Sequence, residues 1–332
     1  MGRAVILAAD VGGTKSYLSL YELTDSGLDP LVERRYRSTD FAGVPELLEF
    51  FVRDAGHRPS RVVLGVPGPV RHPPVKPVNL PWVIDPVEIG EALGLDQVYL
   101  LNDLEATAYG TLNLQPHDVV QINAGVPDDT GNRAVIAAGT GLGEGGLCWA
   151  GDRYVAIPSE GGHASFAPGT DLEAELWKWL FTRYGHVSWE RVVSGPGLEH
   201  IYEFLRDAGH GAEPDWLAQE LAGTDDRAGC ISRAAASGRS DLAEQAVDLF
   251  VSLYGAEAGN LALKLLSSGG VYIGGGIAPK MIERLRSGAF MDAFAEKGRV
   301  SEVLRDMPVY VVLNDKAGLL GAAYFGAHLA GR

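Results

Sequence analysis

Short apolar runs alternate with glycine turns and helical patterns along the first third of the chain. Residues 4–9 predict a buried strand, and residues 17–21 resume extended chain after a glycine-rich turn. Residues 45–55 have the spacing of an amphipathic helix. Residues 61–66 and a run that ends at Asn102 are further strands. This order predicts a mixed α/β domain.

The same pattern begins again past Gly110. Residues 133–138 are an apolar run that enters a second glycine turn, and residues 146–150 resume an extended pattern. Helices follow, the longest from about Asp241, and a strand at residues 270–273 ends in three glycines before another predicted helix. A strand over residues 308–313 and a helix from Lys316 close the chain. The repeat predicts a second α/β domain.

The second turn also satisfies the dinucleotide pattern G-x-G-x-x-G, over Gly141–Gly146. That fingerprint requires a helix to open at the turn, whereas the apolar run after it and the turn at Gly151 favour a strand. We therefore exclude a Rossmann site. The chain also has no G-x-x-x-x-G-K-[ST], which excludes a Walker-type phosphate loop.

Asp103 follows an apolar strand and precedes a helix-forming run. Carboxylates at the carboxyl ends of strands in α/β proteins are held in fixed geometry, which a general base needs. An Asp before Leu-Glu-Ala is equally typical of a helix N-cap, whose side-chain oxygen accepts a free backbone N–H. The segment alone leaves both interpretations open.

The two glycine turns are candidate phosphate sites. A turn that carries Asp10, Thr14 and Lys15 can present backbone N–H groups and a hydroxyl to a phosphate, while the carboxylate reaches a metal-bound water. Paired glycines also occur simply because a tight turn needs a positive φ. The triple glycine at residues 274–276 is a third candidate, suited to a purine and ribose or purely steric.

Glu160 and His163 flank two glycines, and Glu190 lies farther along the chain. A carboxylate and an imidazole offer acceptors and a donor to neighbouring hydroxyls, as sugar recognition requires. The alternatives are a structural histidine and solvent-exposed glutamates.

Composition narrows the possible partners. The chain has 28 Lys and Arg against 43 Asp and Glu, a net charge of −15, and its basic residues are scattered, which argues against nucleic-acid binding. A polyanion must therefore bind through local N–H groups and Mg²⁺. No apolar run reaches membrane-spanning length. The two cysteines, Cys148 and Cys230, lie far apart and indicate neither a zinc site nor a disulfide framework, which suits the cytoplasm.

Taken together, six motifs in this order resemble the bacterial glucokinase family, within the larger actin, sugar kinase and Hsp70-like group. The matching motifs are Asp-Val-Gly-Gly-Thr (10–14), Asn-Asp-Leu-Glu-Ala (102–106), Ala-Gly-Thr-Gly-Leu-Gly (138–143), Glu-Gly-Gly-His (160–163), Glu-Arg-Val-Val-Ser-Gly-Pro-Gly-Leu (190–198) and Gly-Gly-Gly-Ile (274–277). The resemblance implies an α/β chain with two domains of the actin-like, ribonuclease H-like ATPase fold and a ligand cleft between them. Residues 1–112, completed by the helix 316–332, would form the small domain and residues 113–315 the large one.

The resemblance also implies a function: ATP-dependent phosphorylation of D-glucose at the 6-hydroxyl, the entry step of glycolysis, by a homodimer. Asp103 would be the catalytic base, and Asn102, Asp103, Glu160, His163 and Glu190 would bind glucose. ATP would lie on Asp10, Gly12, Gly13, Thr14, Lys15, Gly139, Thr140, Gly141, Gly274, Gly275 and Gly276. Mg²⁺ would arrive with ATP and not be held by the protein alone, with Asp10 reaching it through water.

The chain departs from the family pattern in the first motif. Ala9 and Lys15 stand where many close relatives have Gly and Asn, and Lys at this place is typical of the repressor/kinase branch. No cysteine-rich zinc motif of that branch follows His163, so Lys15 is expected as an extra phosphate contact. Alternatives are a broader hexose or amino-sugar kinase, a polyphosphate-using kinase, and a sugar sensor that has lost catalysis. The retained Asp103 and the lack of a helix-turn-helix extension argue against a sensor.

Overall fold

The computed structural model describes residues 4–25, 27–77 and 80–328. The chain divides into two compact units, which are described separately. Unit 1 comprises Met1–Asp118, Asp152–Pro158 and Asn314–Arg332, and unit 2 comprises Val119–Gly151 and Ser159–Leu313.

A five-stranded sheet with the order β3-β2-β1-β4-β5 forms the centre of unit 1. Its strands are β1 (Val5–Val11), β2 (Lys15–Thr24), β3 (Gly27–Arg37), β4 (Arg61–Val66) and β5 (Val98–Asn102). β2 is antiparallel to β1 and β3, whereas β1, β4 and β5 are parallel. The carboxyl ends of β1, β4 and β5 therefore meet at one edge of the sheet.

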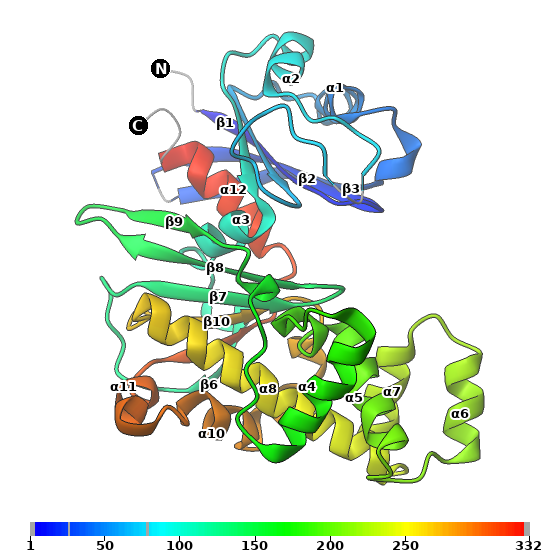
Figure 1. The fold of residues 1–332 in the computed structure, drawn as a ribbon. Helices are drawn as coiled ribbons and strands as arrows, with labels where there is room; N and C mark the ends of the chain where they lie inside the picture. The colour runs from blue at the N-terminus through cyan, green and yellow to red at the C-terminus, as the bar shows by residue number, and fades with distance from the viewer. Residues whose placement is uncertain (1–3, 26, 78–79, 329–332) are drawn as a thin grey trace. The chain divides into compact units, whose positions relative to one another are not determined.

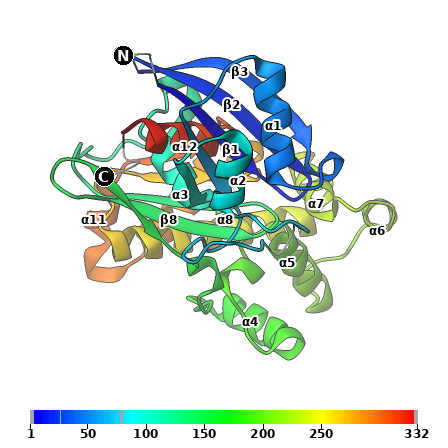
Figure 2. The same ribbon diagram turned by 90° about the horizontal axis from the view of Figure 1, so that it is seen from above.

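Helices cover both faces of this sheet, as Figure 1 shows. They are α1 (Val44–Ala55), α2 (Pro86–Leu93), α3 (Asp103–Gly110) and α12 (Ala317–His328), with the short 3-10 turns η1 (Ser38–Asp40) and η2 (Pro116–Asp118). Figure 2, seen from above, shows α1 and α2 in front of the strands. Leu7 and Leu64 belong to the core under these two helices. Ala8 and Val63, their neighbours along the strands, are also fully buried because their side chains point to the opposite face.

Unit 2 contains most of a six-stranded sheet with the order β6-β11-β10-β7-β8-β9. Its strands are β6 (Val119–Asn123), β7 (Arg133–Ala138), β8 (Leu142–Trp149), β9 (Tyr154–Pro158), β10 (Val271–Gly274) and β11 (Val309–Val312). β7, β10 and β11 are parallel, and β8 is antiparallel to β7. The order β9-β8-β7-β10-β11 repeats the order β3-β2-β1-β4-β5 of the first sheet. The repeated strand–turn–strand pattern in the sequence therefore corresponds to a repeated sheet topology.

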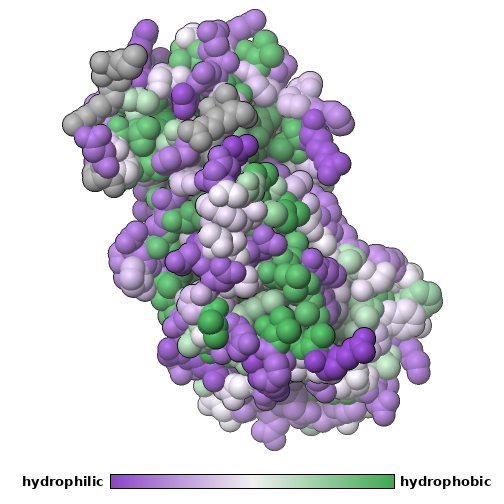
Figure 3. All heavy atoms as spheres, turned by 90° about the vertical axis from the view of Figure 1, so that its left-hand side faces the viewer, coloured by the Kyte–Doolittle hydropathy of each residue, from purple (hydrophilic) through white to green (hydrophobic). Residues whose placement is uncertain are grey.

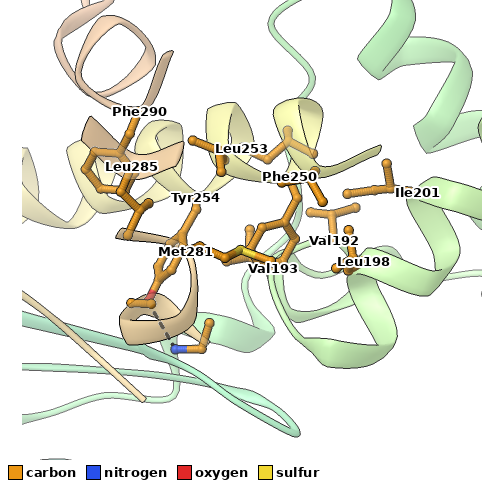
Figure 4. Packing of buried hydrophobic residues seen from close by; sticks show 14 of the residues in the cluster. Val192, Val193, Leu198, Ile201, Phe250, Leu253, Tyr254, Met281, Leu285 and Phe290 are labelled. Carbon is orange, nitrogen blue, oxygen red and sulfur yellow. Dashed lines mark hydrogen bonds between the residues drawn. The ribbon is translucent and has the colours of Figure 1, made fainter. Parts of the chain in front are cut away.

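The helices of unit 2 pack around α8 (Asp241–Leu265), a 25-residue helix that lies along the sheet (Figure 1). The others are α4 (Asp171–Tyr184), α5 (Gly195–Asp207), α6 (Asp215–Ala222), α7 (Arg227–Ala236), α9 (Ile282–Arg286), α10 (Ala289–Ala295) and α11 (Ser301–Arg305), with the 3-10 turns η3 (Gly161–His163), η4 (Trp189–Arg191), η5 (Ala278–Lys280) and η6 (Gly298–Val300). Figure 4 shows Phe250, Leu253 and Tyr254 of α8 in the core of this unit.

Among the described residues, no helix has both the length and the apolar character needed to span a bilayer. Some large hydrophobic side chains stay exposed, including Val87, Val126 and Leu266. The face drawn in Figure 3 shows hydrophobic areas among hydrophilic ones. Such a mixed surface is ordinary for globular proteins.

Candidate active site

The strand–helix junction at Asn102 and Asp103 shows which residue caps α3. Asn102 is the N-cap: its Oδ1 accepts the backbone N–H groups of Leu104 (2.9 Å) and Glu105 (3.4 Å). The Glu105 carboxylate in turn accepts the Asn102 N–H at 3.0 Å, which completes a capping box. The interpretation of Asp103 as the cap is therefore wrong by one residue. Asp103 is the first residue of the helix, and its half-buried carboxylate also accepts the Leu104 N–H.

Close packing of small residues fixes the helix that carries Asp103. A Cβ atom on Gly110 of α3 would collide with the backbone of Ala317, and one on Gly321 of α12 would collide with the backbone at Ala106. The C-terminal helix is thus in direct backbone contact with α3. The Asp103 carboxylate starts from a rigid element at the carboxyl edge of the sheet, which is the placement that a general base requires.

Asp10 lies at the same edge, near the end of β1, opposite Gly65 of β4. Its carboxylate is half-buried, and burial together with the negative charge of Asp103 raises the pKa of Asp10 to about 6. The sequence placed both aspartates at strand ends, and the structure brings them within electrostatic reach of each other. Two carboxylates that repel each other in this way form a site suited to a cation or a proton.

Buried hydroxyl groups stabilise the turn after Asp10. The Gly12 N–H donates to the Lys15 carbonyl at 3.1 Å, and the Ser38 hydroxyl donates to the Gly12 carbonyl at 2.6 Å. Ser16 and Ser38 are themselves joined at 3.0 Å. A Cβ on Gly12 would lie 2.7 Å from the Lys15 oxygen, so this glycine is required sterically. The side chains of Thr14 and Lys15 are exposed, and Gly13 is half-buried.

The second turn, between β7 and β8, is held differently. The Gly139 N–H donates to the Gly141 carbonyl (2.9 Å), and the Gly139 carbonyl accepts the N–H of Gly195 (2.8 Å). The Glu190 carboxylate accepts the Leu142 N–H at 3.1 Å. A Cβ on Gly141 would lie 2.6 Å from Glu190 Oε2. Thr140, at the tip, is exposed.

Glu190 and His163 are neighbours within unit 2. The second carboxylate oxygen of Glu190 lies 3.9 Å from His163 Nδ1, and the His163 side chain remains 63% exposed. Glu160 precedes η3 and is exposed. The structure thus brings two of the three predicted sugar ligands of this unit together, with one side of the imidazole open to a ligand.

The two glycines between Glu160 and His163 have a packing reason. A Cβ on Gly161 would collide with the carboxylate of Glu144, and one on Gly162 would collide with the Leu142 carbonyl. The turn therefore lies directly on β8. Its glycines allow close contact with that strand.

The triple glycine after β10 does not open a helix as predicted. A turn leads instead into η5 and then the five-residue helix α9. Gly275 has φ 82° and packs against Ala138, whereas a Cβ on Gly276 would meet open space. The Tyr254 hydroxyl, drawn in Figure 4, accepts the Ala138 N–H at 3.2 Å and lies 3.3 Å from the Gly274 carbonyl. The ends of β7 and β10 are thereby joined.

Sequence reasoning missed two buried acids in unit 2, Glu144 on β8 and Glu257 on α8. Burial and the neighbouring Glu257 raise the pKa of Glu144 to about 8, and burial also raises the pKa of Glu257. The signal was present, because Glu144 interrupts an otherwise apolar and glycine-rich strand. Ser38 was missed as well, and nothing in its sequence neighbourhood marks it.

No three His, Cys, Asp or Glu side chains are grouped as a metal site in the part of the chain that the structure describes. Both cysteines are free thiols.

Comparisons with known proteins show which family the chain is similar to. The family model described as glucokinase matches residues 7–329. The glucokinase of Nostoc punctiforme is 41% identical over 98% of this chain and 99% of its own length, and that of Synechocystis sp. is 39% identical over 97% of both. The crystal structure of glucokinase from an Antarctic psychrotroph is 32% identical, with a TM-score of 0.87 over 98% of this chain and 99% of that one.

A more distant structure shares the fold. The ROK family glucokinase from Streptomyces griseus, solved in complex with glucose and AMPPNP, has a TM-score of 0.61 at 22% identity and covers 97% of this chain and 99% of its own. The predicted α/β fold of the actin-like, ribonuclease H-like ATPase group is thus confirmed. Because the family model and the relatives cover nearly the whole chain, this protein belongs to the glucokinase family.

Proposed function

We propose that this chain transfers the γ-phosphoryl group of ATP to the 6-hydroxyl of D-glucose, giving glucose 6-phosphate and ADP at the entry to glycolysis. The observation that carries the proposal is the placement of Asp103. Asp103 is the first residue of α3, at the carboxyl edge of the sheet, and its carboxylate interacts electrostatically with Asp10.

Asp103 is proposed to accept the proton of the 6-hydroxyl. Phosphoryl transfer needs alignment and neutralisation of charge more than covalent chemistry, so one oriented carboxylate suffices for the nucleophile. Asp103 is a better candidate than Asp10, because burial and repulsion favour the protonated form of Asp10. A base must be ionised before it can take a proton.

The other sugar hydroxyls are proposed to bind Asn102, Glu160, His163 and Glu190. The capping oxygen of Asn102 is occupied, and one amide hydrogen is donated to the Gly68 carbonyl at 3.1 Å. One amide hydrogen of Asn102 therefore remains for a hydroxyl oxygen. Glu190 keeps lone pairs for a hydroxyl donor while it holds the Leu142 N–H.

The nucleotide is proposed to bind the two glycine turns with its phosphates and Gly274–Gly276 with its adenosine. Gly12, Gly13, Thr14 and the exposed Lys15 would contact phosphate from unit 1, and Gly139–Gly141 from unit 2. The open space beside Gly139 and Gly276 supports this, because neither position has a protein neighbour that would explain its glycine. Lys15→Ala is expected to raise the KM of ATP and leave that of glucose unchanged.

Mg²⁺ fits this chain as a partner of ATP. Asp10 offers a carboxylate whose ionised form is disfavoured by Asp103, so a cation nearby would relieve the repulsion. When bound, Mg²⁺ neutralises charge on the transferring phosphate. Asp10 would hold it through water, as oxygen ligands commonly do for this ion.

The direct test is ADP formation from Mg-ATP with a panel of hexoses and amino sugars, repeated with polyphosphate as donor. Turnover with glucose as the best acceptor is the expected result. Preference for another sugar or for polyphosphate would correct the substrate. Sugar binding without transfer from any donor would favour a sensor.

We further propose that the chain works as a homodimer in the cytoplasm. The dimer rests on the family resemblance, and the location on the need for ATP and on the two free thiols. Light scattering coupled to gel filtration should give twice the mass of 35.3 kDa. A mass of one chain would exclude the dimer.

A further inference from the structure

Two carboxyl groups are buried together behind the His163 turn. The Glu144 residue, on β8, is 1% exposed, and Glu257, on α8, is 0% exposed. The two carboxyl groups interact electrostatically, and one oxygen of each, Glu144 Oε1 and Glu257 Oε1, is buried without a hydrogen-bond partner among the described residues. The Asn260 amide donates to Glu257 Oε2 at 2.8 Å, and Lys264 Nζ lies 3.7 Å from Glu257 Oε1.

Two interacting carboxyl groups that are both buried, each with an oxygen that lacks a donor, favour a proton on one of them. Two ionised carboxylates in a buried site would be strongly unfavourable, and a single Lys contact at 3.7 Å does not offset both. The donors at Glu257 place the negative charge on that residue. Glu144 is therefore the protonated partner at neutral pH, in agreement with its raised pKa of about 8.

The Glu144 carboxyl lies against the turn that carries His163, one of the predicted sugar ligands. Gly161 packs so closely on the Glu144 carboxyl that no Cβ fits between them, and Gly162 packs on the carbonyl of Leu142, two residues before Glu144. The N–H of the same Leu142 donates to Glu190. The β8 segment from Leu142 to Glu144 thus supports both His163 and Glu190.

We propose that the buried carboxyl pair of Glu144 and Glu257 positions the Gly161–His163 turn, and through it His163, for sugar binding. Glu144 and Glu257 are positioning residues, because neither side chain faces solvent. The inference rests on the proposed function and adds that glucose binding should weaken at alkaline pH. Loss of the proton from Glu144 makes both groups negative, so they repel each other beneath the turn.

Other charged groups around Glu144 and Glu257 influence which of the two carboxyl groups is ionised. Lys264 and Lys297 act on Glu257, and Lys264 also favours the ionised form of Glu144. Tyr254 is close enough that Glu144 raises the pKa of the phenol. Glu160 and His163 lie on the supported turn. The Lys264 contact is made to Glu257, and among the described residues no positively charged group is in direct contact with Glu144. Ionisation of Glu144 therefore remains unfavourable.

The test compares the glucose KM of the wild type, Glu144→Gln and Glu144→Leu from pH 6.5 to 9.5 at saturating Mg-ATP. Glutamine keeps the shape and an N–H donor toward Glu257 but has no proton to lose. In the wild type the KM should rise about tenfold from pH 7 to pH 9, as expected for one group that titrates near 8, with a smaller change in kcat. Glu144→Gln should keep the neutral-pH KM within about twofold and lose the alkaline rise, whereas Glu144→Leu should raise the KM at every pH.

Glu173→Gln is the matched control, since Glu173 is another largely buried glutamate of unit 2 whose carboxylate accepts the Gly169 N–H. It should keep the wild-type pH profile. An alkaline rise of equal size in Glu144→Gln would overturn the positioning role, as would a Glu144→Leu variant with the wild-type KM. Absence of ADP formation by the wild type with every sugar is a different result, because it rejects the proposed function itself.

Discussion

The two glycine turns share one strand–turn–strand plan but are stabilised by different chemistry. In unit 1 the Ser38 hydroxyl holds the turn through the Gly12 carbonyl and is itself joined to the Ser16 hydroxyl. In unit 2 the turn is held by the Glu190 carboxylate itself. In unit 1 the side chains that stabilise the turn therefore differ from the proposed catalytic and metal-binding side chains. In unit 2 one side chain, Glu190, both stabilises the turn and is a proposed sugar ligand.

This difference has a functional consequence. A change that weakens the unit 1 turn should affect the nucleotide alone, because the hydroxyls that support this turn, those of Ser16 and Ser38, are fully buried. A change at Glu190 should affect both substrates, since its two oxygens reach Leu142 and His163. Variants in each turn can therefore test this distinction.

The largest effect is expected from Asp103→Asn, which keeps the shape of the side chain and removes the base. The kcat should fall by about 10²–10⁴, the usual contribution of a general base, while glucose binding persists. Parallel assays of ADP formation and of glucose binding by calorimetry measure both. Glu105→Gln, a nearby acid that serves the capping box, is the control and should keep most of the kcat. An Asp103→Asn variant with nearly full turnover would contradict the assignment.

A pair of alanine substitutions tests whether the turns are glycine-rich for the same reason. Gly12→Ala places a Cβ 2.7 Å from the Lys15 carbonyl and should raise the KM of ATP by about tenfold or more, because the turn must shift. A Cβ on Gly139 meets no protein atom within 4 Å, so Gly139→Ala should fold with an unchanged melting temperature.

The activity of Gly139→Ala then decides what the second glycine is for. If the KM of ATP rises while stability is unchanged, the space is needed for the ligand. If both are unchanged, Gly139 is not a phosphate contact and that part of the proposal fails.

The sequence predicted those parts of the fold in which the local pattern and the tertiary structure agree. The helix predicted over residues 45–55 is α1 (Val44–Ala55). The strand after Gly141 was also predicted, and it excluded the Rossmann motif. The local sequence pattern did not predict β3, because all of its residues are half-buried or exposed and show no clear alternation.

The candidate site was less accessible from sequence, because its supports are tertiary. Asp103 and Asn102 were both singled out, but which of them caps α3 depends on side-chain torsions that a sequence does not contain. Ser38 contacts Gly12 across 26 residues, and Glu144 meets Glu257 across the sheet–helix interface of unit 2. Such contacts form only once the chain has folded.

Glu190→Gln and Ser38→Ala form the direct test of the comparison. Loss of the Ser38 hydroxyl removes one hydrogen bond to Gly12, about 1 kcal/mol, and should raise the KM of ATP about fivefold with glucose unaffected. Glu190→Gln keeps the size of the side chain and weakens two contacts, so the KM values of ATP and glucose should both rise. Steady-state kinetics with each substrate varied in turn measure the four values. Selective loss of glucose affinity in Glu190→Gln would show that Leu142 is held without its carboxylate.

The smallest expected effect is the acid side of the pH profile, which depends on Asp10. Its pKa is raised from 3.8 to about 6, so its stability contribution is fully present below pH 3.8 and is lost as the pH rises through 6. The ionised form of Asp10, which is proposed to face Mg-ATP, appears as the pH rises through about 6. Affinity for Mg-ADP should therefore fall about fourfold from pH 7 to pH 5.5, the change in the ionised fraction of a group with pKa 6. In Asp103→Asn, the pH at which Mg-ADP affinity falls should be lower, because the negative charge that repels Asp10 has been removed. Calorimetry at each pH measures this affinity. The same transition in both proteins would mean that burial alone sets the pKa of Asp10, and that the two carboxylates at this edge act independently.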